Sequence, residues 1–120
     1  MTDSCSGGLS VLKYIKRWSN DYKIIYVADY EKNPFGLKNH VEIVNIVKSW
    51  FTNLVKKDKV KIVVIACNTA SIAIKYKKAE LSKKFGIPVI TMIDGIKKCI
   101  KIMKSTLEIK MWLLWLLNTP

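Results

Sequence analysis

The sequence contains few of the features that mark particular classes of protein. Its three cysteines, Cys5, Cys67 and Cys99, form neither a Cys-x-x-Cys metal pair nor a secreted disulfide framework. Its longest apolar run, 111–117, has seven residues, far fewer than the roughly 20 that span a bilayer. The first residues lack the basic start and apolar core of a secretory signal. We therefore expect a cytoplasmic protein with reduced cysteines and no membrane partner.

Arginine is scarce too, although the chain is strongly basic. Only Arg17 among the 21 basic residues is an arginine, and the formal net charge is +12. Proteins that bind nucleic acid commonly use arginine, because its planar fork pairs with phosphate and guanine. The lysines recur at the polar positions of apparent helices, so a solvated lysine surface is the preferred interpretation. We therefore do not expect nucleic acid as a partner. The alternatives to a solvated surface are a nucleic-acid contact and the attraction of acidic metabolites.

The pattern of apolar residues predicts the fold class. Half of the 120 residues are apolar, which suits one folded domain and excludes a disordered tail. Apolar runs typical of strands buried on both faces lie at 23–28, 60–66 and 88–93. Helical patterns lie at 10–18, 39–55, 69–85 and 94–104, the last with Asp94 as its expected cap. This alternation predicts a three-layer α/β domain with a short, mostly parallel sheet.

Both ends of the sequence depart from this alternation. Only the residues MTDS precede the first helix, so an opening strand is nearly absent. The segment MWLLWLL at 111–117 follows neither the helical nor the strand period. Two interpretations of this segment are kept: a buried terminal helix or strand, and a segment that binds a partner. We therefore divide the chain into an α/β domain at 1–104 and an atypical apolar tail at 105–120.

The segment IVVIACNTASIAI at 62–74 carries the most informative chemistry. A buried strand ends at Ala66, and Cys67, Asn68 and Thr69 follow directly before a helix. Ligands of open parallel sheets gather at the carboxyl ends of strands, and a helix N-terminus favours a thiolate and an anionic ligand. Cys67 is therefore predicted to lie at the mouth of a cleft, where Asn68 and Thr69 can hold a carboxylate. The alternative is a buried cysteine beside an ordinary helix cap.

The motif ACNTAS resembles the N-terminal half-site of glutamate racemases, which belong to the cofactor-independent aspartate/glutamate racemase family. Further segments agree with this family in order and spacing, and together the resemblance covers residues 3–104. They are the opening DSCSGGLSVL at 3–12, YVAD at 26–29 with NPFG at 33–36, and FGIPVI at 85–90.

The resemblance implies interconversion of L- and D-glutamate, which supplies D-glutamate for peptidoglycan and so serves cell wall biogenesis and cell shape. Two thiols on opposite faces of the α-carbon exchange the proton, without metal, nucleotide or other cofactor. Here it implies one catalytic thiol, Cys67. It also implies a glutamate pocket lined by Asp3, Ser4, Phe35, Gly36, Asn68 and Thr69.

Several features depart from the family pattern. Cys5 replaces a glycine of the opening motif, which we interpret as a tolerated turn substitution, and Phe35 replaces a tyrosine. Cys99 lies among apolar residues of a predicted helix and is expected in the core. His40, the only histidine, is expected at the surface near a helix start.

The largest departure is the second domain, whose catalytic cysteine has no counterpart in the sequence. We therefore expect an N-terminal half that racemises poorly or not at all by itself. A second copy could supply the missing group across an uncovered interdomain face, so a homo-oligomer stays open. A non-catalytic binding module and a degenerate fragment are the alternatives to an enzyme.

Overall fold

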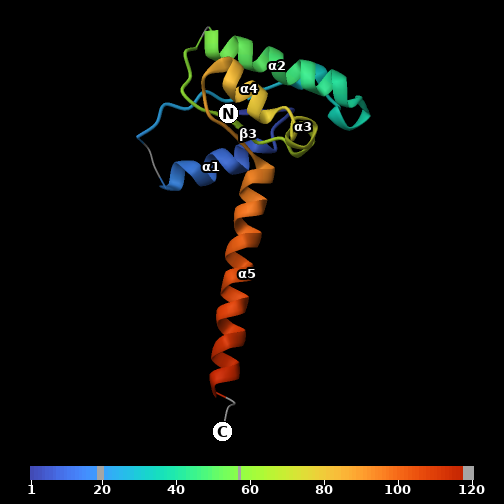
Figure 1. The fold of residues 1–120 in the computed structure, drawn as a ribbon. Coiled ribbons are helices and arrows are strands. Elements are labelled where there is room, and N and C mark those ends of the chain that lie inside the picture. Colours follow the sequence, from blue (N-terminus) through green and yellow to red (C-terminus); the bar gives the residue numbers. More distant parts are fainter. Residues whose placement is uncertain (19–20, 57, 118–120) are drawn as a thin grey trace.

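The structure is a computed structural model that describes residues 1–18, 21–56 and 58–117, with side chains described up to residue 107. Strands and helices alternate along the chain (Figure 1), which confirms the predicted fold class. In order, the elements are β1 (Thr2–Asp3), α1 (Gly8–Trp18), β2 (Val27–Ala28), the 3-10 helices η1 (Tyr30–Lys32) and η2 (Phe35–Leu37), α2 (His40–Lys56), β3 (Val63–Ile65), α3 (Asn68–Ala73), α4 (Lys78–Phe85), β4 (Val89–Thr91) and α5 (Met92–Leu117).

The strands form one parallel sheet in the order β2-β1-β3-β4. The opening segment, which looked too short for a strand, supplies the two-residue β1 between β2 and β3. The Thr2 carbonyl accepts the Ala66 N–H at 2.8 Å, and the Asp3 carbonyl accepts the Asp29 N–H at 3.1 Å. A strand this short persists because it is bonded on both sides, so that little of its backbone is left to solvent.

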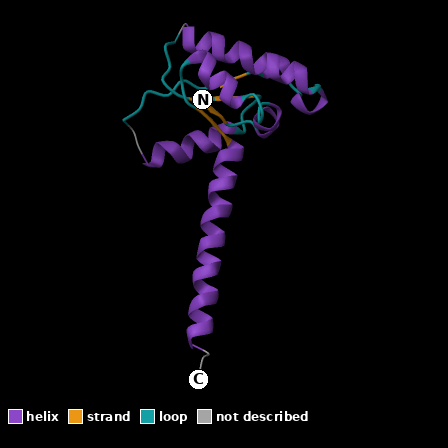
Figure 2. Ribbon diagram, in the orientation of Figure 1, coloured by secondary structure: helices purple, strands orange, loops and turns teal. Residues whose placement is uncertain are grey.

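The strand order places the helices on two faces of the sheet. Because crossovers between parallel strands are right-handed, the β1-to-β2 connection and the β3-to-β4 connection run over opposite faces. Figures 1 and 2 show α2 and α4 on one side of the strands and α1 on the other. The sheet is thus covered in a three-layer arrangement, as predicted.

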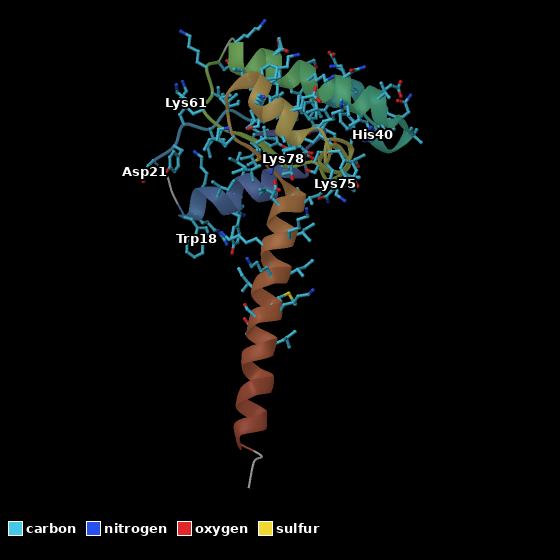
Figure 3. All side chains as sticks on the ribbon, in the orientation of Figure 1. Trp18, Asp21, His40, Lys61, Lys75 and Lys78 are labelled. Carbon is cyan, nitrogen blue, oxygen red and sulfur yellow. The ribbon has the colours of Figure 1, made fainter. Side chains whose placement is uncertain are left out.

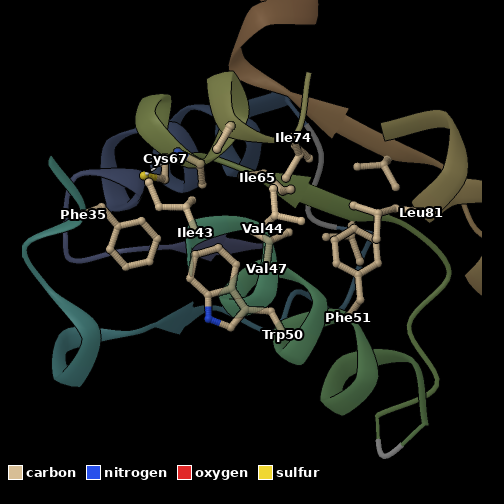
Figure 4. Packing of buried hydrophobic residues seen from close by; sticks show 14 of the residues in the cluster. Phe35, Ile43, Val44, Val47, Trp50, Phe51, Ile65, Cys67, Ile74 and Leu81 are labelled. Atoms are coloured by element: carbon tan, nitrogen blue, oxygen red, sulfur yellow. Dashed lines mark hydrogen bonds between the residues drawn. The ribbon is translucent and has the colours of Figure 1, made fainter. Parts of the chain in front are cut away.

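The main core lies between the sheet and the layer of α2, α3 and α4 (Figure 4). Val47 and Phe51 of α2 and Ile65 of β3 are fully buried there, and Phe51 packs on Phe85 with 5.4 Å between ring centroids. The opposite layer is thinner, because Gly8 is the one buried residue of α1. Trp18, at the end of α1, is 78% exposed (Figure 3).

In the middle of the chain, one predicted helix forms two helices in the structure. The helix predicted at 69–85 is divided into α3 and α4, because the Lys75 and Lys77 N–H groups bond to carbonyls three residues earlier and tighten the chain. The predicted surface position of His40 at a helix start is confirmed, since it is the exposed first residue of α2. Gly86 ends α4 with a left-handed φ of 66°, a conformation that suits glycine.

The last helix starts earlier and ends later than predicted. Thr91, rather than Asp94, precedes its first turn, and the two residues bond reciprocally: the Thr91 N–H donates to Asp94 at 2.8 Å and the Asp94 N–H to the Thr91 hydroxyl at 3.4 Å. Instead of ending near Lys104, α5 continues to Leu117. The predicted core position of Cys99 is wrong, because this cysteine is exposed.

The burial of the MWLLWLL side chains lies outside the described residues. Among the helices that the structure describes, none combines the length and the apolar character needed to cross a bilayer.

Candidate active site

The sheet has a topological switch point between β1 and β3. These strands are neighbours, yet the chain leaves their carboxyl ends toward opposite faces of the sheet. Such a point is where open α/β sheets bind ligands. Ser4 follows β1 there and Cys67 follows β3, so two residues that are 63 positions apart in sequence meet at one edge.

Cys67 is held in place by the start of α3. It is the residue that caps this helix, with an extended backbone at φ −81° and ψ 124°. Its sulfur accepts the Ala70 N–H at 3.4 Å, and its thiol donates to the Ser4 hydroxyl at 3.4 Å. The sulfur therefore touches a fixed backbone donor on one side and a hydroxyl from the neighbouring strand on the other.

The sulfur is more buried than the sequence analysis predicts. Cys67 keeps 6% of its surface exposed and belongs to the apolar core cluster, near Phe35 and Ile43 in Figure 4. The reason is the short β1, which brings Ser4, itself buried, directly over the thiol. The next residue, Asn68, is exposed, and Thr69 is half-buried. The thiol is therefore buried beside the exposed Asn68, instead of lying at the mouth of an open cleft.

Asp3 holds the loop that carries Ser4. Asp3 is 3% exposed, and its two carboxylate oxygens accept the Ser4 N–H at 2.8 Å and the Gly8 N–H at 2.6 Å. It joins the end of β1 to the first turn of α1, where a negative charge is favourable. In this structure Asp3 therefore acts within the protein, by fixing the 4–8 loop next to Cys67.

Tyr26 completes this arrangement, although the sequence analysis did not single it out. Its hydroxyl lies 3.0 Å from the Cys5 carbonyl and 3.3 Å from the Asp3 carboxylate, either of which can accept its hydrogen. Burial, followed by the negative charge of Asp3, raises the pKa of Tyr26 to about 12. A phenol within an otherwise apolar strand run is the signal that could have indicated such a polar partner.

Replacement of Asp3 by asparagine tests this network. One of the two N–H donors then faces an amide NH₂, so we expect a loss of about 2–3 kcal/mol in the free energy of unfolding. The pKa of Tyr26 should fall from about 12 but stay above its ordinary value of 10.0, because burial is its largest cause. Ultraviolet titration of tyrosine against a Tyr26→Phe control measures this. An unchanged tyrosine titration would contradict the contact.

The raised pKa of Tyr26 also fixes the sign of a pH effect. A folded-state pKa above the unfolded value means that the protonated phenol is favoured by folding. Its contribution to stability is therefore complete below pH 10 and is lost as the pH rises toward about 12. The Tyr26→Phe chain should lack this part of the alkaline decline.

The remaining predicted pocket residues, Phe35 and Gly36, lie in η2, which packs against α3. Phe35 is 3% exposed and stacks on Trp50, with ring centroids 5.7 Å apart and planes at 17°. A tyrosine hydroxyl in this buried position would need a partner, which suits the phenylalanine found here. Gly36 is exposed, and a side chain at this position would meet no atom within 4 Å. Of the two, only Gly36 presents its surface to solvent.

Ser71 is a second residue that the sequence analysis missed. It is fully buried, donates to the Ile65 carbonyl at 3.3 Å and accepts the Met92 N–H at 3.2 Å. It therefore ties α3, which carries the turn after Cys67, to the ends of β3 and β4. Its position four residues after Cys67, on the same helical face, was the available signal.

The three cysteines differ in environment, which predicts an order of reactivity. Cys99 is exposed and Cys5 is half-exposed, and the pKa of Cys5 is lowered mainly by the Gly7 N–H. Because alkylation requires an accessible thiolate, Cys5 and Cys99 should react with iodoacetamide at least about tenfold faster than the buried Cys67. Mass spectrometry of tryptic peptides over time measures the order. If Cys67 reacted first, its burial in solution would be refuted.

Comparisons of sequence and structure relate the chain to known proteins. No known family model matches the chain. The glutamate racemase of Leptospira interrogans is 36% identical over 100 residues, which are 83% of this chain and 38% of that protein. The glutamate racemase of Aquifex aeolicus is 34% identical over 104 residues, covering 86% of this chain and 39% of its own length.

Solved structures show the same relation in three dimensions. The glutamate racemase from Aquifex pyrophilus superposes with a TM-score of 0.72 at 35% identity, covering 83% of this chain and 38% of its own. The Escherichia coli glutamate racemase, solved with L-glutamate and an activator, gives a TM-score of 0.68 at 34% identity, covering 75% and 33% of the two chains. The chain is therefore a relative of the glutamate racemases, one that spans little more than a third of their length.

Proposed function

We propose that this chain provides one half-site for the cofactor-independent racemisation of glutamate, with Cys67 as the group that moves the α-proton. The observation that carries the proposal is the position of Cys67 at the β1/β3 switch point, where its sulfur contacts the Ser4 hydroxyl at 3.4 Å. A relative named glutamate racemase is 36% identical over this region. That similarity supports glutamate as the substrate.

The chemistry follows from the contacts of the sulfur. A thiolate at Cys67 takes the α-proton from one face of glutamate and becomes a thiol. The Ala70 N–H, 3.4 Å from the sulfur, stabilises the thiolate, and the Ser4 hydroxyl accepts from the thiol. The site thus has a partner for each protonation state of Cys67.

Substrate recognition is assigned to the rim of the site. Asn68 is exposed and Thr69 half-buried at the start of α3, where N–H groups and side-chain donors suit a carboxylate. Gly36 offers open space beside them. Ser4 contacts the sulfur at 3.4 Å, so Ser4 and the loop that follows it, in which Ser6 and Gly7 are exposed, have to move for glutamate to reach the sulfur. Asp3 and Phe35 are buried and support this rim from inside the protein. Asp3 holds the loop at 4–8, and Phe35 packs on Trp50 next to Gly36.

One thiol reaches one face of the α-carbon. Among the described residues the other cysteines are Cys5, which follows Ser4, and Cys99, which is exposed on α5. Inversion requires a proton donor on the opposite face, and the chain spans only 38% of the relative's length. We therefore assign to this chain exchange of the α-hydrogen with retention of configuration.

Proton NMR of L-glutamate with the purified chain in D₂O tests the proposal. We expect loss of the α-hydrogen signal, catalysed by the protein, while chiral chromatography shows only the L-isomer. Formation of D-glutamate would refute the half-site assignment. Absence of exchange at high protein concentration would refute Cys67 as a base toward glutamate.

The proposal extends to the cellular role and location. D-Glutamate is a component of peptidoglycan, and a thiol base needs a reducing compartment to stay reduced. All three cysteines are free in this structure. We therefore place the half-site in cell wall synthesis in the cytoplasm.

A further inference from the structure

Helix α5 stands apart from the domain. It starts at the end of β4, packs against β4 and α3, and then runs away from the sheet as a single helix (Figure 1). The molecule is accordingly elongated, with principal extents of 65 × 36 × 28 Å. A single helix in water gains most of its stability from packing an apolar face, so the stability of α5 depends on what contacts its apolar side.

One side of α5 is apolar and uncovered. Ile96, Ile100, Met103 and Leu107 follow each other at steps of four, three and four residues, which places them on one face of a helix. Their exposed fractions are 53%, 48%, 62% and 57%. Side chains of this size in a continuous row form the kind of apolar strip that marks a binding surface.

Lysines supply all the charge on residues 95–107 of this helix, whose exposed surface outside the apolar row also includes Ile102, Ser105 and Thr106. Helical geometry turns the lysines away from the apolar row, and all are exposed: Lys97, Lys98, Lys101 and Lys104. An apolar face flanked by lysines is the composition of helices that lie in the interface of an anionic membrane. The downstream segment MWLLWLL adds tryptophan and leucine, residue types that favour this interface.

Charge decides whether a second copy of the chain or a membrane covers the apolar row of α5. A second copy would bring a second net charge of +12 and a second row of lysines, so a homodimer through α5 is opposed by electrostatic repulsion. An anionic bilayer complements both sides of the helix at once, since lipid phosphates attract the lysines and the acyl boundary receives the apolar row.

We propose that α5 is a surface-binding helix that docks the chain on anionic phospholipid membranes. The expectation of no membrane partner came from the short apolar runs, which bear on spanning a bilayer, whereas a helix lying in the interface needs only one apolar face. The proposal is independent of the half-site chemistry, because none of its residues belongs to the switch point.

Cosedimentation of the full chain with large unilamellar vesicles tests the proposal. Binding to vesicles of equal parts phosphatidylcholine and phosphatidylglycerol should exceed binding to pure phosphatidylcholine by at least about tenfold and should fall as salt is raised. The double variant Ile100→Asp, Met103→Asp should lose at least about tenfold in affinity, because two charges replace half the apolar row. Circular dichroism and thermal melting verify that this variant folds.

The matched control is Val41→Asp, which changes a 67% exposed apolar residue on α2 and should bind vesicles like the unchanged chain. Cys67→Ala should also bind unchanged, which separates this result from the proposed function. Absence of binding to anionic vesicles, or equal binding by the Ile100→Asp, Met103→Asp variant, would overturn the proposal. A dimer in light scattering that disappears in this variant, without vesicle binding, would assign the strip to a second copy instead.

Discussion

Replacement of Cys67 by alanine is expected to abolish the incorporation of deuterium into the α-position of glutamate. In the proposed half-site the sulfur of Cys67 takes the proton, and the structure places this atom at the switch point with Ser4 and Ala70 as its partners. A methyl group cannot accept a proton. We therefore expect exchange to fall to the rate of the protein-free solution, measured by proton NMR.

The control for this experiment is Cys99→Ala. Cys99 is exposed on α5, so its removal should leave both exchange and stability as they are. The Cys67→Ala chain should remain folded, since it loses one sulfur atom from the core and roughly 1–2 kcal/mol with it. Residual exchange by a folded Cys67→Ala chain would move the base to another group and refute the assignment.

Replacement of Gly8 by alanine is expected to have the largest effect among the glycines. A Cβ atom at Gly8 would lie 2.8 Å from the Ala66 Cβ and 3.1 Å from the Asp3 Cβ. Both of these atoms are fixed to strand ends, so α1 has to move away from the sheet. We expect a loss of about 2 kcal/mol in the free energy of unfolding, which lowers Tm by roughly 10 °C.

The same shift should weaken the candidate site. The Gly8 N–H bonds to the Asp3 carboxylate at 2.6 Å, and Asp3 in turn holds the N–H of Ser4. Glutamate exchange by Gly8→Ala should therefore drop even at a temperature where the chain is folded. Thermal melting by circular dichroism, combined with the exchange assay, measures both effects.

Gly95→Ala is the matched control within a helix. Nothing lies within 4 Å of a Cβ at Gly95, and alanine in a helix is favoured over glycine by up to about 1 kcal/mol. We expect this variant to be slightly more stable and equally active. If Gly8→Ala and Gly95→Ala had the same stability, the close approach of α1 to the sheet would be disproved.

The sequence predicts the layers of the fold well because they follow from local patterns. Three of the strands lie within the predicted apolar runs, and α1 and α2 differ from their predictions by one or two residues. The pattern was less informative where the chain relies on distant contacts. Strand β1 has two residues and is stabilised by bonds from the Asp29 and Ala66 N–H groups on either side, which no local window contains.

The prediction for α5 shows the converse problem. Ile96, Ile100 and Met103 have the spacing of a buried face, so Cys99 among them was assigned to the core. Periodicity indicates which residues share a face, but it does not indicate that another element covers that face. In the structure no described element covers the 96–107 row, and its members are about half exposed or more.

For the candidate site, the residues Cys67, Asn68 and Thr69 could be predicted to lie at a strand end before a helix. The roles of Ser4 and Asp3 came from a resemblance and stay predictions with respect to substrate. Only the structure shows that the Asp3 carboxylate is occupied by the Ser4 and Gly8 N–H groups, and that Tyr26 and Ser71 support the site. These bonds join residues between 1 and 21 positions apart, and their geometry depends on how the chain between the partners folds.

By itself, the sequence determined the alternation of strands and helices, the strand-to-helix position of Cys67 and the basic surface, because these depend on residue type and spacing along the chain. The tertiary structure decided how deeply the Cys67 sulfur is buried, what the Asp3 carboxylate binds, and that the apolar side of α5 is uncovered. Each of these depends on which distant segment comes to lie beside a residue, and that is set by the order β2-β1-β3-β4 in the sheet.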